Sequence, residues 1–401
     1  MKKIYYGRAV YDEKEINAVL KVLKNNSLQL IDGNNVKKLE KKISQLFGKK
    51  YGLMVNSGSS ALILAIEALN LKKGSEIIVP CLNFGTAVSS VLICGHKPVF
   101  VDAEIETLQI NISKLEKKIT KKTKAIMIPN LIGNVPDWKK IYKISRKFKL
   151  PLIEDSADTL GASIDRKPTG VYSDISITSF YGSHIISCAG NGGMLLTNNK
   201  KYYEKAKVLR SWGRMSSLIK DSENIVKRLN IKLKGIDYDK KFVFSELGYN
   251  FEPSEIGAAF GLVQLKKFRK FMLLRNKNFN KHLNFFKKLN EYFIVPKVHK
   301  NVKTNFLAYP IILNTNKFNR KNLQIFLEEN NIQTRPIFSG NILRHPAFAN
   351  LINKKNKLSE FKNADYIMKN GILIGCHQGL KNKDIDYIHS IINNFIMKFK
   401  S

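Results

Sequence analysis

Residues 152–158, LIEDSAD, have the pattern of a short buried strand that runs into acidic residues. Leu152 and Ile153 follow a segment with helical periodicity that ends near Leu150, which is typical of a strand in a parallel sheet. Ligands bind outside the carboxyl ends of such strands, so Asp155 and Asp158 are candidate ligand-binding residues. The alternative is that these acids only cap or turn the chain, because Asp favours both positions.

A second candidate segment is the small, polar turn of residues 55–61, VNSGSSA, which opens the helical pattern of residues 62–69, LILAIEAL. The first turn of a helix offers free N–H groups and the positive end of the helix dipole, so Gly58 and Ser59 are placed to bind a phosphate. The turn has neither the Gly-Lys-Ser/Thr of a Walker A loop nor GxGxxG spacing. Taken alone, it is equally well explained as an ordinary capped helix.

The third segment is SFYGSHIIS at residues 179–187, followed by CAGNGGMLLT at residues 188–197. Its glycines permit close approach of the backbone to a ligand, and the apolar run after them predicts a strand. A pyridoxal 5′-phosphate (PLP) site needs a phosphate-binding turn and a carboxylate at the pyridine nitrogen. Gly58, Ser59 and Asp155 would supply these groups, and His184 would add an imidazole base.

These segments, in this order and spacing, resemble the DegT/DnrJ/EryC1/StrS family of PLP-dependent sugar-modifying enzymes over residues 5–395. The Asn-Ser-Gly-Ser/Thr, Glu-Asp-x-Ala, Ser-Phe-x-x-x-Lys and Gly-Tyr-Asn segments of the family match, in turn, residues 56–59, 154–157, 179–184 and 248–250. His184 stands where the family has the lysine that holds PLP covalently. No lysine lies between Lys167 and Lys200 to replace it.

With histidine at this position, the chain resembles one sub-branch of the family. Its members are the pyridoxamine 5′-phosphate (PMP)-dependent 3-dehydratases of nucleotide-linked 4-keto-6-deoxyhexoses. Residues 210–214, 338–341, 344–346 and 365–368 match this sub-branch too, although it commonly has a second histidine where Ile185 stands. The resemblance implies removal of the carbon-3 hydroxyl, with His184 as the base, to give a 3-deoxy sugar for lipopolysaccharide O-antigen or another surface glycan. Two alternatives are a nucleotide-sugar aminotransferase with noncovalently held PLP and a noncatalytic PLP-fold protein.

Other roles follow from the resemblance alone. The cofactor-binding residues would be Gly58 and Ser59 (phosphate, through N–H groups), Ser179 (phosphate, through its hydroxyl), Asp155 (pyridine nitrogen), Asp158 (ring hydroxyl) and Phe84 (ring stacking). Phe84 is equally well explained as a core residue. Asn250 would reach the phosphate of the partner subunit, so the working unit would be a homodimer with shared active sites. Arg344 and His345 would bind the nucleotide-diphosphate sugar.

The cysteines bear on a second cofactor. CDP-sugar relatives carry an iron–sulfur cluster on four cysteines, three of them close together, whereas residues 215–244 hold none here. The four cysteines are scattered, without Cys-x-x-Cys spacing, at positions 81, 94, 188 and 376. We therefore expect no iron–sulfur cluster and no other metal site, and a cytoplasmic protein. The resemblance to family members without an iron–sulfur cluster implies that PMP is made from PLP with L-glutamate as the amino donor.

The resemblance also implies the fold, which is the aspartate aminotransferase-like fold-type I of PLP-dependent transferases. We expect a large α/β domain (residues 1–270) with a mostly parallel seven-stranded sheet, and a smaller C-terminal α+β domain (residues 271–401). Short apolar runs predict strands at residues 77–79, 99–101, 125–128, 152–153, 175–179 and 306–313. Residues 215–241 are expected to form an inserted loop or helix near the site.

The formal net charge is +36 over 401 residues. The lysines are spread along the chain without an arginine-rich arm or a nucleic-acid motif, so neither nucleic acid nor a membrane surface is expected as a partner. A basic surface would attract the diphosphate of a nucleotide-sugar. The sequence has no apolar run of 18 residues and no signal-peptide core after Met1.

Overall fold

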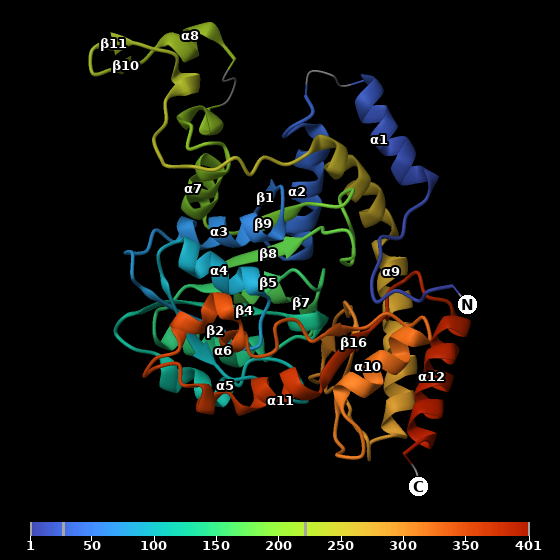
Figure 1. The fold of residues 1–401 in the computed structure, drawn as a ribbon. Helices are drawn as coiled ribbons and strands as arrows, with labels where there is room; N and C mark the ends of the chain where they lie inside the picture. Colours follow the sequence, from blue (N-terminus) through green and yellow to red (C-terminus); the bar gives the residue numbers. More distant parts are fainter. Residues whose placement is uncertain (1, 26–28, 220–222, 400–401) are drawn as a thin grey trace.

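The computed structural model describes residues 2–25, 29–219 and 223–399, and its centre is a seven-stranded sheet (Figure 1). In spatial order the strands are β1 (Tyr51–Val55), β9 (Gly193–Thr197), β8 (Ile175–Ser179), β5 (Leu152–Ser156), β4 (Thr123–Pro129), β2 (Glu76–Pro80) and β3 (Lys97–Val101). Every pair from β8 to β3 is parallel, and β9 runs antiparallel to both its neighbours. The predicted mostly parallel sheet is therefore confirmed.

Helices cover both faces of this sheet because its strands are apolar on both sides. In β2, Ile77 and Val79 enter one core cluster while Ile78 enters another, as the two-residue period of a strand requires. On the first face lie α3 (Gly58–Ala68), α4 (Gly85–Ile93) and α7 (Lys200–Arg210); on the other lie α2 (Asn34–Leu46), α5 (Ile112–Leu115) and α6 (Trp138–Lys147). Helix α1 (Glu13–Asn25) packs on α9 (Glu255–Lys287).

A second core lies in the C-terminal part of the chain. It holds a four-stranded sheet of β12 (Phe293–Ile294), β14 (Tyr309–Leu313), β16 (Gly371–Ile374) and β15 (Arg335–Pro336), with helices α9, α10 (Arg320–Glu329), α11 (Lys362–Asn370) and α12 (Asn382–Met397). Helix α9 is 33 residues long and contributes to the cores of both parts, side by side with α12 (Figure 1). The predicted boundary at residue 270 falls inside this helix, and the division into two domains stays a prediction.

The predicted strand at residues 306–313 begins later than expected, at Tyr309. The carbonyls of Phe306 and Leu307 accept hydrogen bonds from the Arg275 guanidinium of α9, at 2.9 and 3.1 Å. Those carbonyls are therefore not free to join a β ladder. The strand starts after these two residues, at Tyr309.

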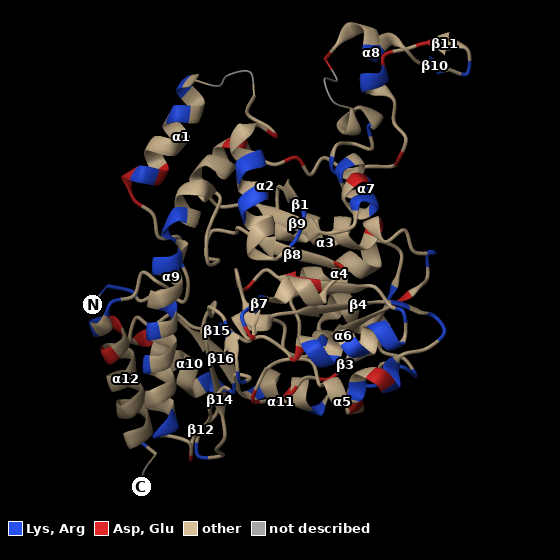
Figure 2. Cartoon of the chain, turned by 180° about the vertical axis from the view of Figure 1, so that it is seen from behind, with Lys and Arg blue, Asp and Glu red and all other residues tan. Residues whose placement is uncertain are grey.

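The described residues between 215 and 241 form an arm that projects from the body of the molecule (Figure 1, top). Its described elements are a helix, α8 (Ile225–Leu229), and a hairpin of β10 (Lys232–Leu233) and β11 (Ile236–Asp237). A short three-stranded sheet elsewhere joins β13 (Val302–Lys303), β6 (Ser163–Ile164) and β7 (Lys167–Pro168). Figure 2 shows the basic residues spread over helices of several layers, with acidic residues among them.

None of the helices in the described ranges combines the length and the apolar character that a bilayer crossing requires.

The contact of β9 with the turn before α3 yields a test of the fold. A Cβ added at Gly193 would lie 2.3 Å from the carbonyl oxygen of Ser57, whereas one at Gly85, on the first turn of α4, would meet nothing within 4 Å. We expect Gly193→Ala to lower the stability by about 1–3 kcal/mol, because backbone must move to relieve the overlap. Thermal unfolding would measure it, with Gly85→Ala as the matched control; equal melting temperatures for the two variants would contradict this packing.

Candidate active site

A cavity of about 1290 Å³ lies at the carboxyl ends of β4, β5 and β8, and the C-terminal part of the chain closes it. This is the edge of a parallel sheet at which ligands bind. Eight of the predicted site residues line it: Gly58, Ser59, Phe84, Asp155, Asp158, Ser179, His184 and His345. The predicted site residues are thus brought together from five separate parts of the chain.

Asp155 and Asp158 are buried, and no ion pair within the described residues involves either of them. Asp155 accepts a hydrogen bond from the amide of Ala157 at 3.0 Å. Burial raises the pKa of Asp155 to about 6 and that of Asp158 to about 7. The charge of Asp155 also contributes to the raised pKa of Asp158. The cavity therefore has two carboxyl groups that would be stabilised by a cation.

The amide of Ile132 donates to Asp158 Oδ2 at 2.8 Å. Ile132 lies in a turn, η2 (Leu131–Gly133), with φ of 60°, which is unfavourable for a β-branched residue. Such backbone strain persists where the surrounding contacts hold it, and it is common at functional sites. Here the amide of Leu307 donates to the Ile132 carbonyl at 2.9 Å, so the C-terminal part of the chain holds the turn that orients Asp158.

The predicted phosphate turn has the geometry of a helix N-terminus. Ser57 is the N-cap of α3, and its side chain accepts from the amide of Ser60 at 3.1 Å. Because Ser57 satisfies only that amide, those of Gly58 and Ser59 are left to face a ligand. A Cβ at Gly58 would lie 2.8 Å from Cβ of Ser179, so the missing side chain lets the turn approach the end of β8.

His184 lies in the turn after β8, where its amide donates to the carbonyl of Tyr181 at 3.0 Å. The side chain lines the cavity, and its buried Nδ1 lacks a well-formed hydrogen bond among the described residues. Burial lowers the pKa of His184 to about 4; the backbone of Ser179 opposes this shift, and the charge of Arg275 adds to it. The imidazole is therefore neutral at physiological pH and free to accept a proton.

Other lining residues were not singled out from the sequence. Arg335 of β15 is the single lysine or arginine among the described residues that line the cavity, and its guanidinium lies 5.9 Å from the ring centre of Tyr6. Burial, with the charge of Asp158, raises the pKa of Tyr6 to about 12. Tyr6 lies near the N-terminus and Arg335 lies in the C-terminal part of the chain. Neither belongs to a sequence motif that could have identified it as a residue of the site.

Phe84 is 54% exposed, and its ring meets Phe338 edge to face at 5.9 Å between centres. An exposed aromatic ring in a cavity is not a core residue, so the packing alternative is wrong for Phe84. His345 donates from Nε2 to the carbonyl of Ser339, at 2.7 Å. Both side chains border the space in which a ligand would lie.

Two predicted residues do not line the cavity of their own chain. Arg344 binds Asp365 through two hydrogen bonds of 2.5 and 2.6 Å, so its role as a substrate ligand stays a prediction without support from this geometry. Asn250 is exposed and pairs through its backbone with Ser211. The amide group of Asn56, beside the phosphate turn, donates to the Asn250 carbonyl at 3.5 Å. None of the described residues between 215 and 241 lines this cavity, so their place near the site stays a prediction.

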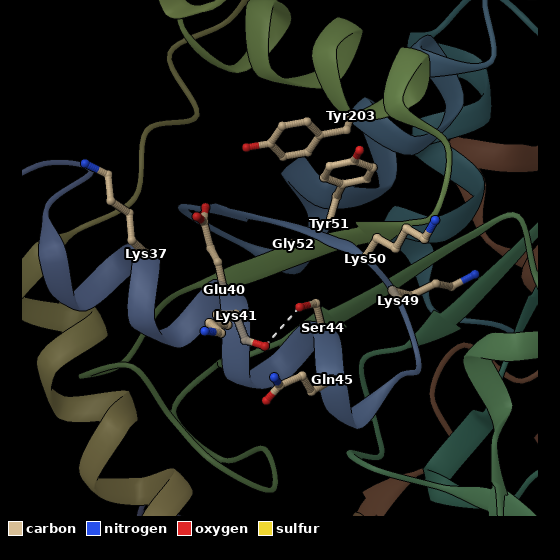
Figure 3. Close-up of a pocket in the computed structure, with 10 residues that line it drawn as sticks. All are labelled: Lys37, Glu40, Lys41, Ser44, Gln45, Lys49, Lys50, Tyr51, Gly52 and Tyr203. Atoms are coloured by element: carbon tan, nitrogen blue, oxygen red, sulfur yellow. Dashed lines mark hydrogen bonds between the residues drawn. The ribbon is translucent and has the colours of Figure 1, made fainter. Parts of the chain in front are cut away.

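A second, smaller cavity of about 380 Å³ lies between α2, β1 and α7 (Figure 3). Tyr51 and Tyr203 stack there at 4.9 Å between ring centres, and burial raises the pKa of Glu40 to about 7. None of the predicted site residues lines this cavity. Within the described ranges, no group of three His, Cys, Asp or Glu side chains is placed to hold a metal ion.

Comparison with known proteins places the chain among sugar-modifying enzymes. Residues 10–393 match the sequence profile of the DegT/DnrJ/EryC1/StrS aminotransferase family. A relative, the lipopolysaccharide biosynthesis protein RfbH of Salmonella typhimurium strain LT2, is 34% identical over 368 residues, which are 89% of this chain and 84% of the relative.

Two solved structures are similar over almost the full length. One is the E. coli GDP-4-keto-6-deoxy-D-mannose-3-dehydratase with bound hydrated PLP, which is 31% identical, with a TM-score of 0.84, over 97% of this chain and 99% of that one. The other is a variant of the same kind of dehydratase, ColD, in which a serine and the histidine directly after it are replaced by asparagine and lysine. It is 31% identical, with a TM-score of 0.83, over 96% of this chain and 100% of that one.

The raised pKa values of the two buried acids yield a test of the cavity electrostatics. An acid with a raised pKa stabilises the fold when it is protonated, and this stability is lost as the pH rises through about 7 for Asp158. In cofactor-free protein, Asp158→Asn should therefore raise the Tm at pH 8 by about 2–4 °C. The gain should shrink steadily as the pH falls towards 5.

Asp237→Asn, at an exposed position of the arm, is the matched control and should leave the Tm unchanged at each pH. The measurement is thermal unfolding at a series of pH values. A lower Tm for Asp158→Asn at pH 8, or a gain independent of pH, would contradict this account of the cavity.

Proposed function

Because the chain belongs to the DegT/DnrJ/EryC1/StrS aminotransferase family, we propose that it uses the cofactor of that family for an elimination. It would act as a PMP-dependent 3-dehydratase that removes the carbon-3 hydroxyl of a nucleotide-linked 4-keto-6-deoxyhexose. The observation that carries this proposal is the composition of the cavity. It holds His184 and two acids, and none of its described lining residues is a lysine.

The absence of lysine separates this cavity from that of an ordinary aminotransferase, which holds PLP covalently on a lysine and uses the same amine as a base. Ser183 and His184 are the one Ser-His pair in the sequence, and both line the cavity. A serine followed by a histidine was also the pair exchanged for asparagine and lysine in the ColD variant. These facts support the assignment of His184 to the position of the family's lysine.

The residues present fit the cofactor. The first turn of α3, with Gly58 against Ser179, would hold its phosphate, and Asp155 would face the pyridine nitrogen. Phe84 would lie on the ring, and Asp158 would lie near the ring hydroxyl. When bound, the cofactor supplies an amine for the keto carbon of the sugar and a ring that accepts electron density.

His184 would then act as the base of the elimination. Its imidazole is neutral above about pH 4, because burial lowers its pKa. A proton is accepted at an imidazole nitrogen that faces the cavity, and the same group can return that proton to the departing hydroxyl. A lysine in its place would bind the cofactor and favour transfer of the amino group.

The wider assignment is part of the same proposal. L-glutamate would restore PMP from PLP. The enzyme would act in the cytoplasm, and its 3-deoxy product would be used for a lipopolysaccharide or another surface glycan. Because Asn250 is exposed and lies outside its own cavity, it would complete the phosphate site of a partner subunit in a homodimer. His345 would contact the nucleotide-sugar.

A second candidate is a nucleotide-sugar aminotransferase that holds PLP without a covalent bond. It is favoured by the family's description, which names an aminotransferase activity. The two candidates differ in their products. An aminotransferase gives an amino sugar that keeps the carbon-3 hydroxyl. A dehydratase gives a 3-deoxy keto sugar and ammonia.

The test is mass spectrometry of the product formed from GDP-4-keto-6-deoxymannose, PLP and L-glutamate, with CDP- and dTDP-linked 4-keto sugars in parallel. The native protein should give a 3-deoxy product. His184→Lys should lose at least about 10²-fold of that activity, because the lysine would bind the cofactor covalently and favour transfer of the amino group. The double variant Ser183→Asn, His184→Lys should give some amino sugar.

The matched control is His299→Lys, because His299 lines a different cavity and should not affect the product. An amino sugar from the native protein would favour the aminotransferase over the dehydratase. A 3-deoxy product from His184→Lys at the native rate would show that His184 is not the base.

A further inference from the structure

Arg275 of α9 is a fully buried arginine, with 0% of its surface exposed, and it has no ion pair with an acid within the described residues. Buried arginines are rare unless an acid pairs with them, because the charge loses its hydration. Oxygens of neutral groups surround this one. Nε donates to Gln378 Oε1 at 2.6 Å, Nη1 to the carbonyls of Phe306 and Leu307, and Nη2 to the carbonyl of His184 at 3.4 Å.

These partners belong to three segments of the chain, and two of the partners, His184 and Leu307, line the cavity. His184 follows β8, residues 306–307 precede β14, and Gln378 follows β16. Leu307 in turn donates to the carbonyl of Ile132, whose amide holds the carboxylate of Asp158. One guanidinium therefore bonds directly to the His184 turn and indirectly, through Leu307 and Ile132, to the support of Asp158.

We propose that Arg275 is a positioning residue for His184: its guanidinium fixes the turn that carries the imidazole and places an unpaired positive charge beside that turn. This inference rests on the proposed function, in which His184 is the base. A base must be held close to the proton it takes, and a displacement of about 1 Å can cost about 10²-fold in rate. A guanidinium suits the task because its planar set of donors reaches several carbonyls at once.

The charge acts in the same direction as burial. Because no carboxylate neutralises Arg275, its field penalises a second positive charge nearby, and it lowers the pKa values of both His184 and His377. Burial in turn lowers the pKa of Arg275 itself to about 10, so it stays charged at physiological pH. The other titratable groups that line the same cavity are Tyr181, whose ring meets that of His184 edge to face, Asp155 at the end of β5, Asp158 after it, Tyr5, Tyr6, Arg335 and His345.

The experiment compares Arg275→Met, which removes the charge and the hydrogen bonds, with Arg275→Lys, which keeps the charge but cannot span the carbonyls. Arg269→Lys is the matched control, because Arg269 is exposed on the same helix. The first readout is the NMR titration of the His184 ring in cofactor-free protein, assigned with His184→Asn. Arg275→Met should raise the pH at which His184 takes up a proton, and Arg275→Lys should leave it nearly unchanged.

The second readout is the kinetics of the dehydration. Both variants should lower kcat by about 10- to 100-fold with little change in KM, because the base is displaced while the substrate contacts remain. Folded variants with native kcat, or an Arg275→Met protein with a native His184 titration, would overturn the proposal. If both substitutions unfold the protein, Arg275 is structural and the proposal fails. The titration needs no substrate, so absence of dehydratase activity in the native protein would reject the proposed function separately.

Discussion

Two buried carboxyl groups that have no ion pair among the described residues dominate the cavity. Asp155 and Asp158 are desolvated together, and the described residues near them offer backbone amides but no ion pair. A chain with a net charge of +36 has many lysines, yet none of the described lining residues is one. The cavity is thus electrostatically prepared for a ligand that carries positive charge on its ring, and a lysine there would neutralise the acids or bind the ligand covalently.

The sheet explains why these groups meet. Parallel strands β5 and β8 end at the same edge, which places Asp155 and Ser179 on one wall. Below that edge, buried Glu154 accepts hydrogen bonds from Asn130, Ser156 and Ser176, at 2.7–2.9 Å. This network fixes the strand ends, because a buried carboxylate is tolerated only when its oxygens are satisfied. The strained turn at Ile132 then completes the support of Asp158 from the neighbouring strand.

Most of the fold could be predicted from local sequence. The runs at residues 77–79, 125–128 and 175–179 form β2, β4 and β8, because short apolar segments between helical patterns have few other ways to be buried. Gly58, Asp155 and His184 were found because they lie in contiguous segments with a chemical logic. The start of the strand predicted at residues 306–313 was misplaced because Arg275, 31 residues before Phe306, donates to the carbonyls of Phe306 and Leu307.

The rest of the site could not be predicted for a related reason. Arg275 and Arg335 are single arginines, one in a long helix and one in a two-residue strand, and no local pattern distinguishes them from the other basic residues. Their significance depends on which carbonyls and rings tertiary packing brings near. Arg344 shows the converse, because it lies in a segment that matches the family but bonds to Asp365 outside the cavity.

The central claim is that this cavity holds its cofactor without a covalent bond to the protein. The most direct measurement is the intact mass of PLP-loaded protein after reduction with borohydride, which would fix any bond between PLP and a lysine. The account predicts an unchanged protein mass for the native chain and a gain of one reduced cofactor for His184→Lys. A gain of one reduced cofactor on the native chain would contradict it.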